Sequence, residues 1–239
     1  MKTLQQIVDK ARRIAFFGGA GVSSASGIPT FRGEEGLYRQ RYGDLTPEMM
    51  LSQSFFYLHP DLFYDFYRAH MLHPDAKPNA AHRKLFELER AGKLAALITQ
   101  NIDGLHRAAG NRYVYELHGS VHENRCIECG RPYDLAWLLC TQGVPKCESC
   151  GGVVKPSVVL YGEGLDHYVT TGACREISRC DTLIIAGTSL TVYPAASLVH
   201  YFRGKHLVLI NRDVTPMDDQ ADLVIHDSVG KVFASLHCS

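Results

Sequence analysis

The feature that most constrains this chain is a glycine-rich loop that directly follows an apolar run. Residues 14 to 17 read Ile-Ala-Phe-Phe, and the loop from Gly18 to Arg32 comes next. Such a run is typical of a buried strand, and glycines let a backbone approach a pyrophosphate closely because they carry no Cβ atom. The spacing of Gly19, Gly21 and Ser24 lacks the third glycine of the usual dinucleotide fingerprint. The pattern therefore indicates a nucleotide site, with a plain glycine-rich turn as the alternative.

Length and charge narrow the class of protein. A chain of 239 residues can bury a sizeable core, as one large domain or as a main domain with a small insertion. The 25 basic residues match the 25 acidic ones, so no overall charge attracts nucleic acid or an anionic membrane. The N-terminal segment is polar, and no apolar stretch has the length of a signal-peptide core or a bilayer span. We therefore expect a cytoplasmic monomer with no nucleic-acid or membrane partner.

Four of the eight cysteines have the spacing of a metal site. Cys126 and Cys129 form one Cys-x-x-Cys pair, Cys147 and Cys150 form another, and seventeen residues separate the pairs. This spacing is typical of a zinc ribbon, in which two tight turns direct four thiolates at one ion. A shell of four sulfurs leaves no position for water, so we expect a structural zinc that stabilises the fold. Redox pairs or disulfides are the alternative.

Short apolar runs alternate with helical patterns along the rest of the chain. Near-continuous apolar runs are typical of strands that are buried on both faces of a parallel sheet. The predicted strands are residues 14–17, 94–98, 113–116, 182–186, 206–210 and 223–225, and the predicted covering helices are residues 80–91, 195–202 and 229–236. This order predicts an α/β fold with a Rossmann-like, doubly wound parallel sheet.

Two segments with little strand character interrupt this pattern and predict a smaller lobe. A helical insertion spans residues 33–75, and the zinc-binding module spans residues 122–154. The nucleotide-binding domain then comprises residues 1–32, 76–121 and 155–239. A ligand cleft is expected between the lobe and the sheet.

Polar side chains follow four of the predicted strands, at the edge where parallel sheets bind ligands. They include an amide, a carboxylate and an imidazole, which would converge on whatever the glycine-rich loop holds. The residues are Gln100, Asn101 and Asp103 after the second strand, His118 after the third, Thr188 and Ser189 after the fourth, and Asn211 and Arg212 after the fifth. Each has a structural alternative, since Asn101 and Asp103 could cap helices and His118 could be a buried core histidine.

These motifs, in this order, resemble the sirtuins, which are NAD-dependent protein lysine deacylases. Gly-Ala-Gly-Val-Ser and Gly-Ile-Pro-Thr-Phe-Arg resemble the sirtuin cofactor loop, and Thr-Gln-Asn-Ile-Asp at residues 99–103 resembles the nicotinamide pocket. His118 and Gly119 resemble the catalytic dipeptide, and the cysteine pairs resemble the zinc module. The resemblance extends over nearly the whole chain through residues 158–163, 187–190 and 211–212.

The resemblance implies a reaction and roles for its residues. In sirtuins the carbonyl oxygen of acyl-lysine attacks the anomeric carbon of the nicotinamide ribose of NAD, nicotinamide leaves, and water completes transfer of the acyl group to ADP-ribose. His118 is the implied base, and Asn101 and Asp103 are implied to hold the nicotinamide carboxamide and the ribose. The implied NAD contacts are Gly19, Ala20, Gly21, Phe31, Arg32, Gln100, Asn101, Ile102, Asp103, His118, Gly187, Thr188, Ser189, Asn211 and Arg212.

The resemblance also implies how the protein substrate binds. Gly162 and Glu163 on one side, and Leu190 and Val192 on the other, resemble the two extended segments between which sirtuins add a substrate strand. The carbonyl of Val159 is implied to accept the acyl-amide hydrogen. Because backbone pairing carries little side-chain information, we expect an acylated-lysine protein or peptide as partner, with broad sequence preference.

The segment expected to form the acyl pocket departs from the family patterns. Sirtuins that prefer acidic acyl groups carry Tyr-x-x-Arg there; in this chain Tyr64 matches, Tyr67 replaces the arginine, and Arg68 follows. If Pro60 begins a helix that ends before Pro74, Tyr64, Tyr67 and Arg68 share a face. Arg68 then either approaches an acyl carboxylate or faces water, and the alternative for Phe63 and Phe66 is an amphipathic helix whose aromatic side chains pack the small lobe. We therefore expect general lysine deacylation with acetyl as the default and with other short acyl groups, including hydroxylated ones, as an option.

Two other functions are alternatives to deacylation. A protein mono-ADP-ribosyltransferase would use the same cofactor site and capture the activated ribose with a protein side chain. A non-catalytic NAD-sensing or zinc-ribbon module would bind without turnover, and the set of Asn101, Asp103 and His118 argues against it.

Overall fold

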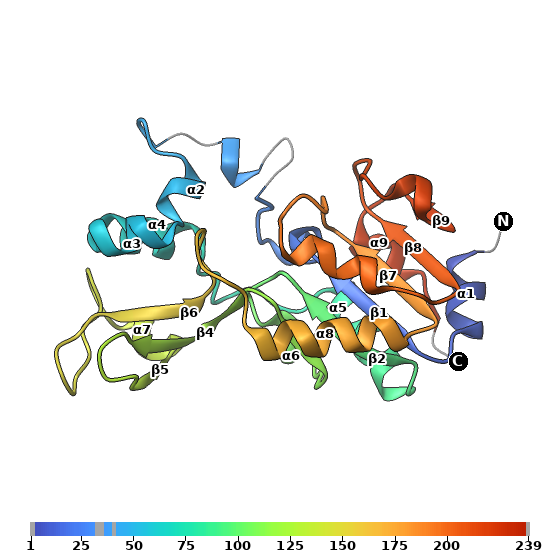
Figure 1. Ribbon diagram of the computed structural model, residues 1–239, viewed down its shortest axis with the longest axis horizontal. Coiled ribbons are helices and arrows are strands. Elements are labelled where there is room, and N and C mark those ends of the chain that lie inside the picture. The colour runs from blue at the N-terminus through green and yellow to red at the C-terminus, as the bar shows by residue number, and fades with distance from the viewer. Residues whose placement is uncertain (1–2, 32–35, 40–41, 238–239) are drawn as a thin grey trace.

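A six-stranded parallel sheet forms the larger part of the molecule (Figure 1). The computed structural model describes residues 3–31, 36–39 and 42–237. The strand order is β3-β2-β1-β7-β8-β9, which confirms the predicted doubly wound arrangement. The strands are β1 (Ile14–Gly18), β2 (Leu94–Thr99), β3 (Val114–Glu116), β7 (Thr182–Ala186), β8 (His206–Ile210) and β9 (Leu223–Ile225).

Helices cover both faces of this sheet, which explains why its strands read as continuous apolar runs. In β1, Ile14 and Phe16 pack against one set of helices, Ala15 and Phe17 face the other set, and all four side chains are fully buried. The first set is α1 (Leu4–Lys10), α5 (Ala80–Arg90) and α9 (Val229–Ala234), and the second is α8 (His167–Arg179) with the 3₁₀ helix η4 (Ala195–Tyr201).

The glycine-rich loop meets the loop after β7 at the point beside β1 where the strand order reverses. It continues β1 through two short 3₁₀ turns, η1 (Ala20–Val22) and η2 (Ser24–Ser26). The Gly21 amide donates to the Gly187 carbonyl at 2.8 Å, and a Cβ atom on Gly21 would lie 2.7 Å from the Gly187 Cα. Only glycine permits this approach, so the loop is fixed at the carboxyl edge of the sheet.

A smaller lobe lies beyond one end of the sheet and combines short helices with a three-stranded antiparallel sheet of order β5-β4-β6 (Figure 1). Its core packs Phe56, Tyr64 and Tyr67 in one apolar cluster with Val158 and Leu160. Its elements are η3 (Leu37–Arg39), α2 (Pro47–Met50), α3 (Gln53–Leu58), α4 (Pro60–His70), β4 (Gly119–Cys126), β5 (Pro132–Asp134), α7 (Leu135–Leu139) and β6 (Val154–Val158). Two short elements lie elsewhere, α6 (Leu105–Ala108) and η5 (Asp218–Gln220).

Several elements differ from the sequence-based expectations. Strands β4 and β6 cross the predicted lobe boundaries after residues 121 and 154, because β4 pairs with β6 from Gly119 to Cys126, with an irregular register between Gly119 and Asn124. Helix α8 and the small sheet were not predicted, and the helix predicted at residues 195–202 has the tighter 3₁₀ winding. None of the described helices combines the length and the apolar character needed to cross a bilayer.

Candidate active site

A cavity of about 1060 Å³ opens at the carboxyl edge of the large sheet, and residues of both lobes line it. Most of the cofactor and substrate residues expected from the sequence line this one cavity. They are Ala20, Gly21, Phe31, Tyr67, Gln100, Asn101, Ile102, His118, Val159, Gly162, Glu163, Gly187, Thr188, Ser189, Val192, Asn211 and Arg212. Those that follow parallel strands, such as Asn101, His118 and Thr188, converge because such strands end at the same edge of the sheet.

The remaining expected residues lie elsewhere. Gly19 supports the loop from below, where its amide donates to the Ala186 carbonyl at 3.1 Å. Asp103 lines a smaller cavity of about 40 Å³ that shares Asn101, Phe31 and other walls with the large one. The Leu190 side chain is buried in the core of the sheet, so only its backbone is available to a substrate. Arg32 lies outside the described residues.

His118 is held in one orientation and one tautomer. Its Nδ1 lies 2.9 Å from the Gln100 carbonyl, which can only accept, so Nδ1 carries the hydrogen and Nε2 keeps its lone pair. Gly119 follows with φ of +71°, and a Cβ atom there would lie 1.9 Å from the Ser157 carbonyl oxygen. The sharp turn into β4 therefore requires glycine, and it sets the imidazole at the cavity wall.

The charge state of His118 follows from its burial. Burial lowers the pKa of His118 below its ordinary value, and the hydrogen bond to Gln100 opposes this effect only in part. The imidazole is therefore neutral at neutral pH, as a general base must be.

Ser23 joins the two polar residues that follow β2. Its hydroxyl donates to Asp103 Oδ2 at 2.6 Å and accepts from Asn101 Nδ2 at 3.0 Å. Asp103 Oδ1 also accepts the amide of Leu105 at 2.9 Å, at the start of α6. The Asp103 carboxylate thus bonds to the first turn of α6 and also belongs to the polar network of the site. The helix-capping role and the active-site role that were considered for Asp103 are therefore compatible. Sequence reasoning placed Ser23 in the cofactor loop but assigned it no role of its own, since a serine in a small-residue loop carries no spacing signal.

Two buried histidines lie close to this network and were also missed by sequence reasoning. The rings of His82 on α5 and His106 on α6 are 4.6 Å apart, and both side chains are almost fully buried. Burial lowers the pKa of His82 to about 4, against an opposing effect of Asp103, and it lowers the pKa of His106 as well. Both rings are therefore neutral supports beneath the site.

The donor set of the large cavity fits NAD. Gln100 Nε2 is buried at the cavity wall and has no hydrogen-bond partner among residues 3–31, 36–39 and 42–237. Such an unpaired donor is costly unless a ligand accepts its hydrogen bond. The backbone cradle at Gly21 and Gly187, which any Cβ would fill, suits the close approach of a pyrophosphate.

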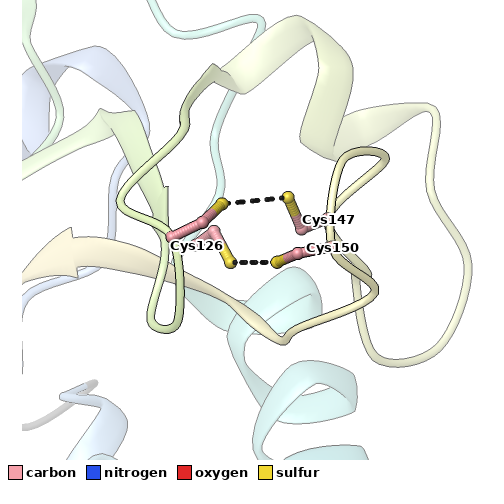
Figure 2. Close-up of side chains that lie close together, drawn as sticks. Cys126, Cys147 and Cys150 are labelled. Atoms are coloured by element: carbon pink, nitrogen blue, oxygen red, sulfur yellow. Dashed lines mark hydrogen bonds between the residues drawn. The ribbon is translucent and has the colours of Figure 1, made fainter.

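The four predicted cysteines form a compact cluster in the small lobe. Their sulfurs all lie within 4.8 Å of one another, with Cys126 Sγ 3.5 Å from Cys150 Sγ and Cys129 Sγ 3.6 Å from Cys147 Sγ. Figure 2 shows Cys126, Cys147 and Cys150 with their thiols turned toward one another. A tetrahedral zinc with bonds of about 2.3 Å places its sulfurs about 3.8 Å apart, so the cluster fits structural zinc.

Tyr133 supports this cluster from β5. Its hydroxyl donates to Cys147 Sγ at 3.2 Å, and this is the largest of several hydrogen bonds that together lower the pKa of that thiol to about 6. The same hydroxyl accepts the amide of Glu148 at 2.9 Å, and Glu148 Oε1 accepts from Trp137 Nε1, also at 2.9 Å. Outer-shell hydrogen bonds of this kind orient a metal ligand.

Only one of the three side chains expected in the acyl pocket lines the cavity. Tyr67 does so, as predicted. Tyr64 and Arg68 do not line the cavity: the Tyr64 hydroxyl donates to the Val154 carbonyl, and Arg68 donates to the Gly143 carbonyl at 2.6 Å and to Thr141 Oγ1 at 2.9 Å. The three side chains do lie on one face of α4, as expected. The loop before β6, however, binds Arg68 at the edge of this face, and helical spacing alone cannot predict that contact.

The segment expected to pair with a substrate is held by internal contacts. Glu163 Oε2 accepts from Lys155 Nζ at 3.1 Å and from the Leu160 amide at 2.9 Å. The Val159 amide donates to the His118 carbonyl at 2.9 Å. Glu163 therefore fixes the shape of the cavity rim, while Val159 lies directly beside the candidate base.

Comparison with known proteins agrees with this geometry. The model of the Sir2 family matches residues 19–194. The NAD-dependent protein deacetylases of Clostridium acetobutylicum and Clostridium perfringens are 53% and 54% identical over 235 residues, which is 98% of this chain and 96% of each relative. A solved structure of Sir2 with a p53 peptide and NAD⁺ is 37% identical, has a TM-score of 0.84, and covers 98% of this chain and 96% of that one.

Proposed function

Because the chain belongs to the Sir2 family, we infer that it is an NAD-dependent protein lysine deacetylase. The enzyme uses NAD as co-substrate and transfers the acetyl group to ADP-ribose, which leaves nicotinamide and free lysine as the other products. The observation that carries this inference is the half-buried, neutral His118 at the wall of a cavity that also presents Asn101 and Gln100.

We assign the base to Nε2 of His118. NAD supplies a ribose whose bond to nicotinamide can be broken, and the chain's own residues hold this sugar and move its proton. Since Nδ1 is committed to the Gln100 carbonyl, Nε2 is the ring nitrogen that accepts the hydroxyl proton. The Gln100 carbonyl also stabilises the protonated ring that results, because it accepts a hydrogen bond in both states.

We assign the nicotinamide end of the cavity to the Ser23 network. Asn101 and Asp103 present an amide and a carboxylate there, and Ser23 fixes their relative positions. Phe31 lines both cavities, and its ring centroid is 5.5 Å from that of Tyr38. The two aromatic rings would exclude water from the sugar while the leaving group departs.

We assign the remaining roles by position in the fold. The substrate peptide adds as a strand beside Gly162 and Val192, with the Val159 carbonyl as acceptor for the acyl amide. The four cysteines hold a structural zinc. The proposed NAD-binding domain comprises residues 1–32, 76–121 and 155–239 and the small lobe residues 33–75 and 122–154, except that the small lobe takes in all of β4 (Gly119–Cys126) and β6 (Val154–Val158). A cytoplasmic location agrees with the described cysteines, which are all unpaired.

The products test the proposal directly. An acetyl-lysine peptide incubated with the protein and NAD should give nicotinamide and O-acetyl-ADP-ribose in equal amounts, measured by mass spectrometry. Nicotinamide release with ADP-ribose on the protein or peptide, and no acetyl-ADP-ribose, would instead identify a mono-ADP-ribosyltransferase. Binding of NAD without any nicotinamide release would identify a non-catalytic module.

A further inference from the structure

Phe31, at the nicotinamide end of the cavity, is held by a turn of the chain. The Tyr38 amide donates to the Phe31 carbonyl at 2.9 Å, and the Leu37 amide donates to the Thr30 carbonyl, also at 2.9 Å. The ring centroids of Phe31 and Tyr38 are 5.5 Å apart, with an interplanar angle of 51°. Both residues line the large cavity, so the place of Phe31 in it depends on where Tyr38 is held.

The substrate segment, which we define as residues 159–163, is held separately, by the small lobe. Two backbone hydrogen bonds fix Tyr161 within it. The Tyr161 amide donates to the Leu51 carbonyl at 3.0 Å, and the Tyr161 carbonyl accepts from the Gln53 amide at 2.9 Å. The neighbouring Leu160 side chain is buried in the core of the small lobe. Tyr161 therefore has a fixed backbone, and it lines the same cavity as Phe31 and Tyr38.

A contact between two side chains joins the Phe31 turn to the substrate segment. The hydroxyls of Tyr38 and Tyr161 are hydrogen-bonded to each other, although 123 positions separate the two residues in sequence. The pair is open to solvent, because Tyr161 is 38% exposed and Tyr38 is half-buried. If one hydroxyl is removed, the other can bond to water, so no buried group is left unpaired. Loss of either hydroxyl should therefore remove this link without the cost of a buried orphan.

We propose that the hydroxyl pair of Tyr38 and Tyr161 positions Phe31 for the reaction, by joining the turn that carries Phe31 to the substrate segment. This proposal rests on the proposed deacetylase function. Phe31 shields the sugar from water only while its ring stays at the nicotinamide end of the cavity, and the pair holds it there from the side where the peptide binds. The two tyrosines are positioning residues, and neither takes part in the chemical step.

Hydrolysis of NAD is the side reaction that this positioning suppresses. The bond from the anomeric carbon to nicotinamide breaks, and water attacks that carbon in place of the acyl oxygen. A carbon–oxygen bond forms, the water loses a proton, and the product is ADP-ribose, while the acetyl group stays on lysine. Nicotinamide is then released without an equal amount of O-acetyl-ADP-ribose. The ratio of these two products therefore reports on the position of Phe31, whereas partial unfolding would lower both products together.

Tyr38→Phe, Tyr161→Phe and the double variant test the link. Each single variant loses one neutral hydrogen bond, so we expect NAD affinity, measured by calorimetry without peptide, to fall by about threefold to tenfold. The initial ratio of nicotinamide to O-acetyl-ADP-ribose should rise by about twofold or more. Because the two hydroxyls act through one bond, the double variant should match the single ones. Peptide affinity without NAD should stay within about twofold of wild type, since the peptide pairs with backbone groups.

Tyr168→Phe is the matched control, because this tyrosine is 87% exposed on α8 and does not line the cavity, and it should behave as wild type. An unchanged product ratio in both single variants would overturn the proposal, and so would effects that multiply in the double variant. Failure of the deacetylase function is a distinct result, since it would appear as no O-acetyl-ADP-ribose from wild type. The NAD affinities of the variants would then still test the link.

Discussion

The large sheet and the zinc end of the small lobe are stabilised in different ways. Strands β1 and β7 are buried along their whole length between two layers of helices. The apolar cluster around the cysteines, in contrast, comprises among the described residues Cys126, Tyr133, Cys147 and Val154, with Trp137 packed against it. Apolar burial is sufficient for the first region, whereas the second needs metal coordination to fold. The two regions should therefore fail under different stresses, although the active site needs both.

Removal of zinc should give the largest difference between the regions. A structural zinc site contributes on the order of 10 kcal/mol to folding, so its loss should unfold the small sheet and abolish deacetylation. Hydrogen exchange after treatment with a chelator should show loss of protection in β4 and β6 but retained protection in β1, β7 and β8.

A matched pair of exposed cysteines controls this experiment. Cys129→Ser should reproduce the effect of the chelator, and Cys140→Ser, outside the cluster, should keep both zinc and activity. Full activity of the zinc-free protein would show that the zinc end of the small lobe folds without metal, which contradicts the difference between the two regions.

Low pH should instead destabilise the large sheet. His82 has a pKa lowered to about 4 by burial, so its neutral form is favoured in the folded state and the unfolded state binds more protons below about pH 6.5. Its stabilisation is complete above pH 6.5 and is lost as the pH falls toward 4, by about 3 kcal/mol in total. Denaturant unfolding followed in β-sheet signal at pH 7 and pH 5 should show this fall.

His82→Gln should weaken the pH dependence, and His200→Gln, at an exposed position, should leave it as in wild type. Equal slopes in all three proteins would mean that His82 is not buried in its neutral form. Zinc release also depends on pH, and comparison of variants at each pH removes that common contribution.

Loss of the Tyr133 hydroxyl should have a smaller effect, confined to the small lobe. Tyr133→Phe removes the hydrogen bond to Cys147 but keeps the aromatic ring, whose centroid is 3.9 Å from the ring centroid of Trp137. We expect about tenfold to 100-fold weaker zinc binding, measured by competition with a chromophoric chelator. Tyr57→Phe, on the exposed surface of α3, serves as control. Equal zinc affinity in both variants would show that the Tyr133 hydroxyl does not support zinc binding.

Loss of the Ser23 hydroxyl should have the smallest effect, at the sheet edge. Ser23→Ala removes one link between Asn101 and Asp103, and we expect kcat/KM for NAD to fall by about tenfold. Ser178→Ala, whose exposed hydroxyl donates to the Arg175 carbonyl of its own helix, should behave as wild type. If Ser23→Ala lost zinc or small-lobe protection as well, the two regions would be coupled more tightly than their contacts indicate.

The same contrast explains what could be predicted from sequence. The sheet strands were found within about one residue because burial on both faces leaves an uninterrupted apolar run, as in Thr182–Ala186. Strand β4 was missed because Ser120 to Arg125 is mostly polar and its pairing with β6 depends on contacts distant in sequence. Helix α8 was missed because few of its side chains are buried, with Ala173 and Ile177 among them.

Site residues followed the same rule. His118 and Asn101 could be placed at the cavity because they follow predicted parallel strands, and topology alone then brings them together. Ser23, His82 and Tyr133 could not, since each acts through a partner that only the tertiary fold supplies. Arg68 shows what helical spacing cannot predict. The spacing indicates which side chains share a helix face, but not that the loop at Gly143 binds Arg68.

The central claim is that His118 serves as the base at the sheet edge, and a single variant tests it most directly. For His118→Ala we would measure NAD affinity by calorimetry and O-acetyl-ADP-ribose formation by mass spectrometry, on protein with full zinc content. The account predicts NAD affinity close to that of wild type and product formation lower by about 10²- to 10⁴-fold. Product formation within tenfold of wild type would contradict it.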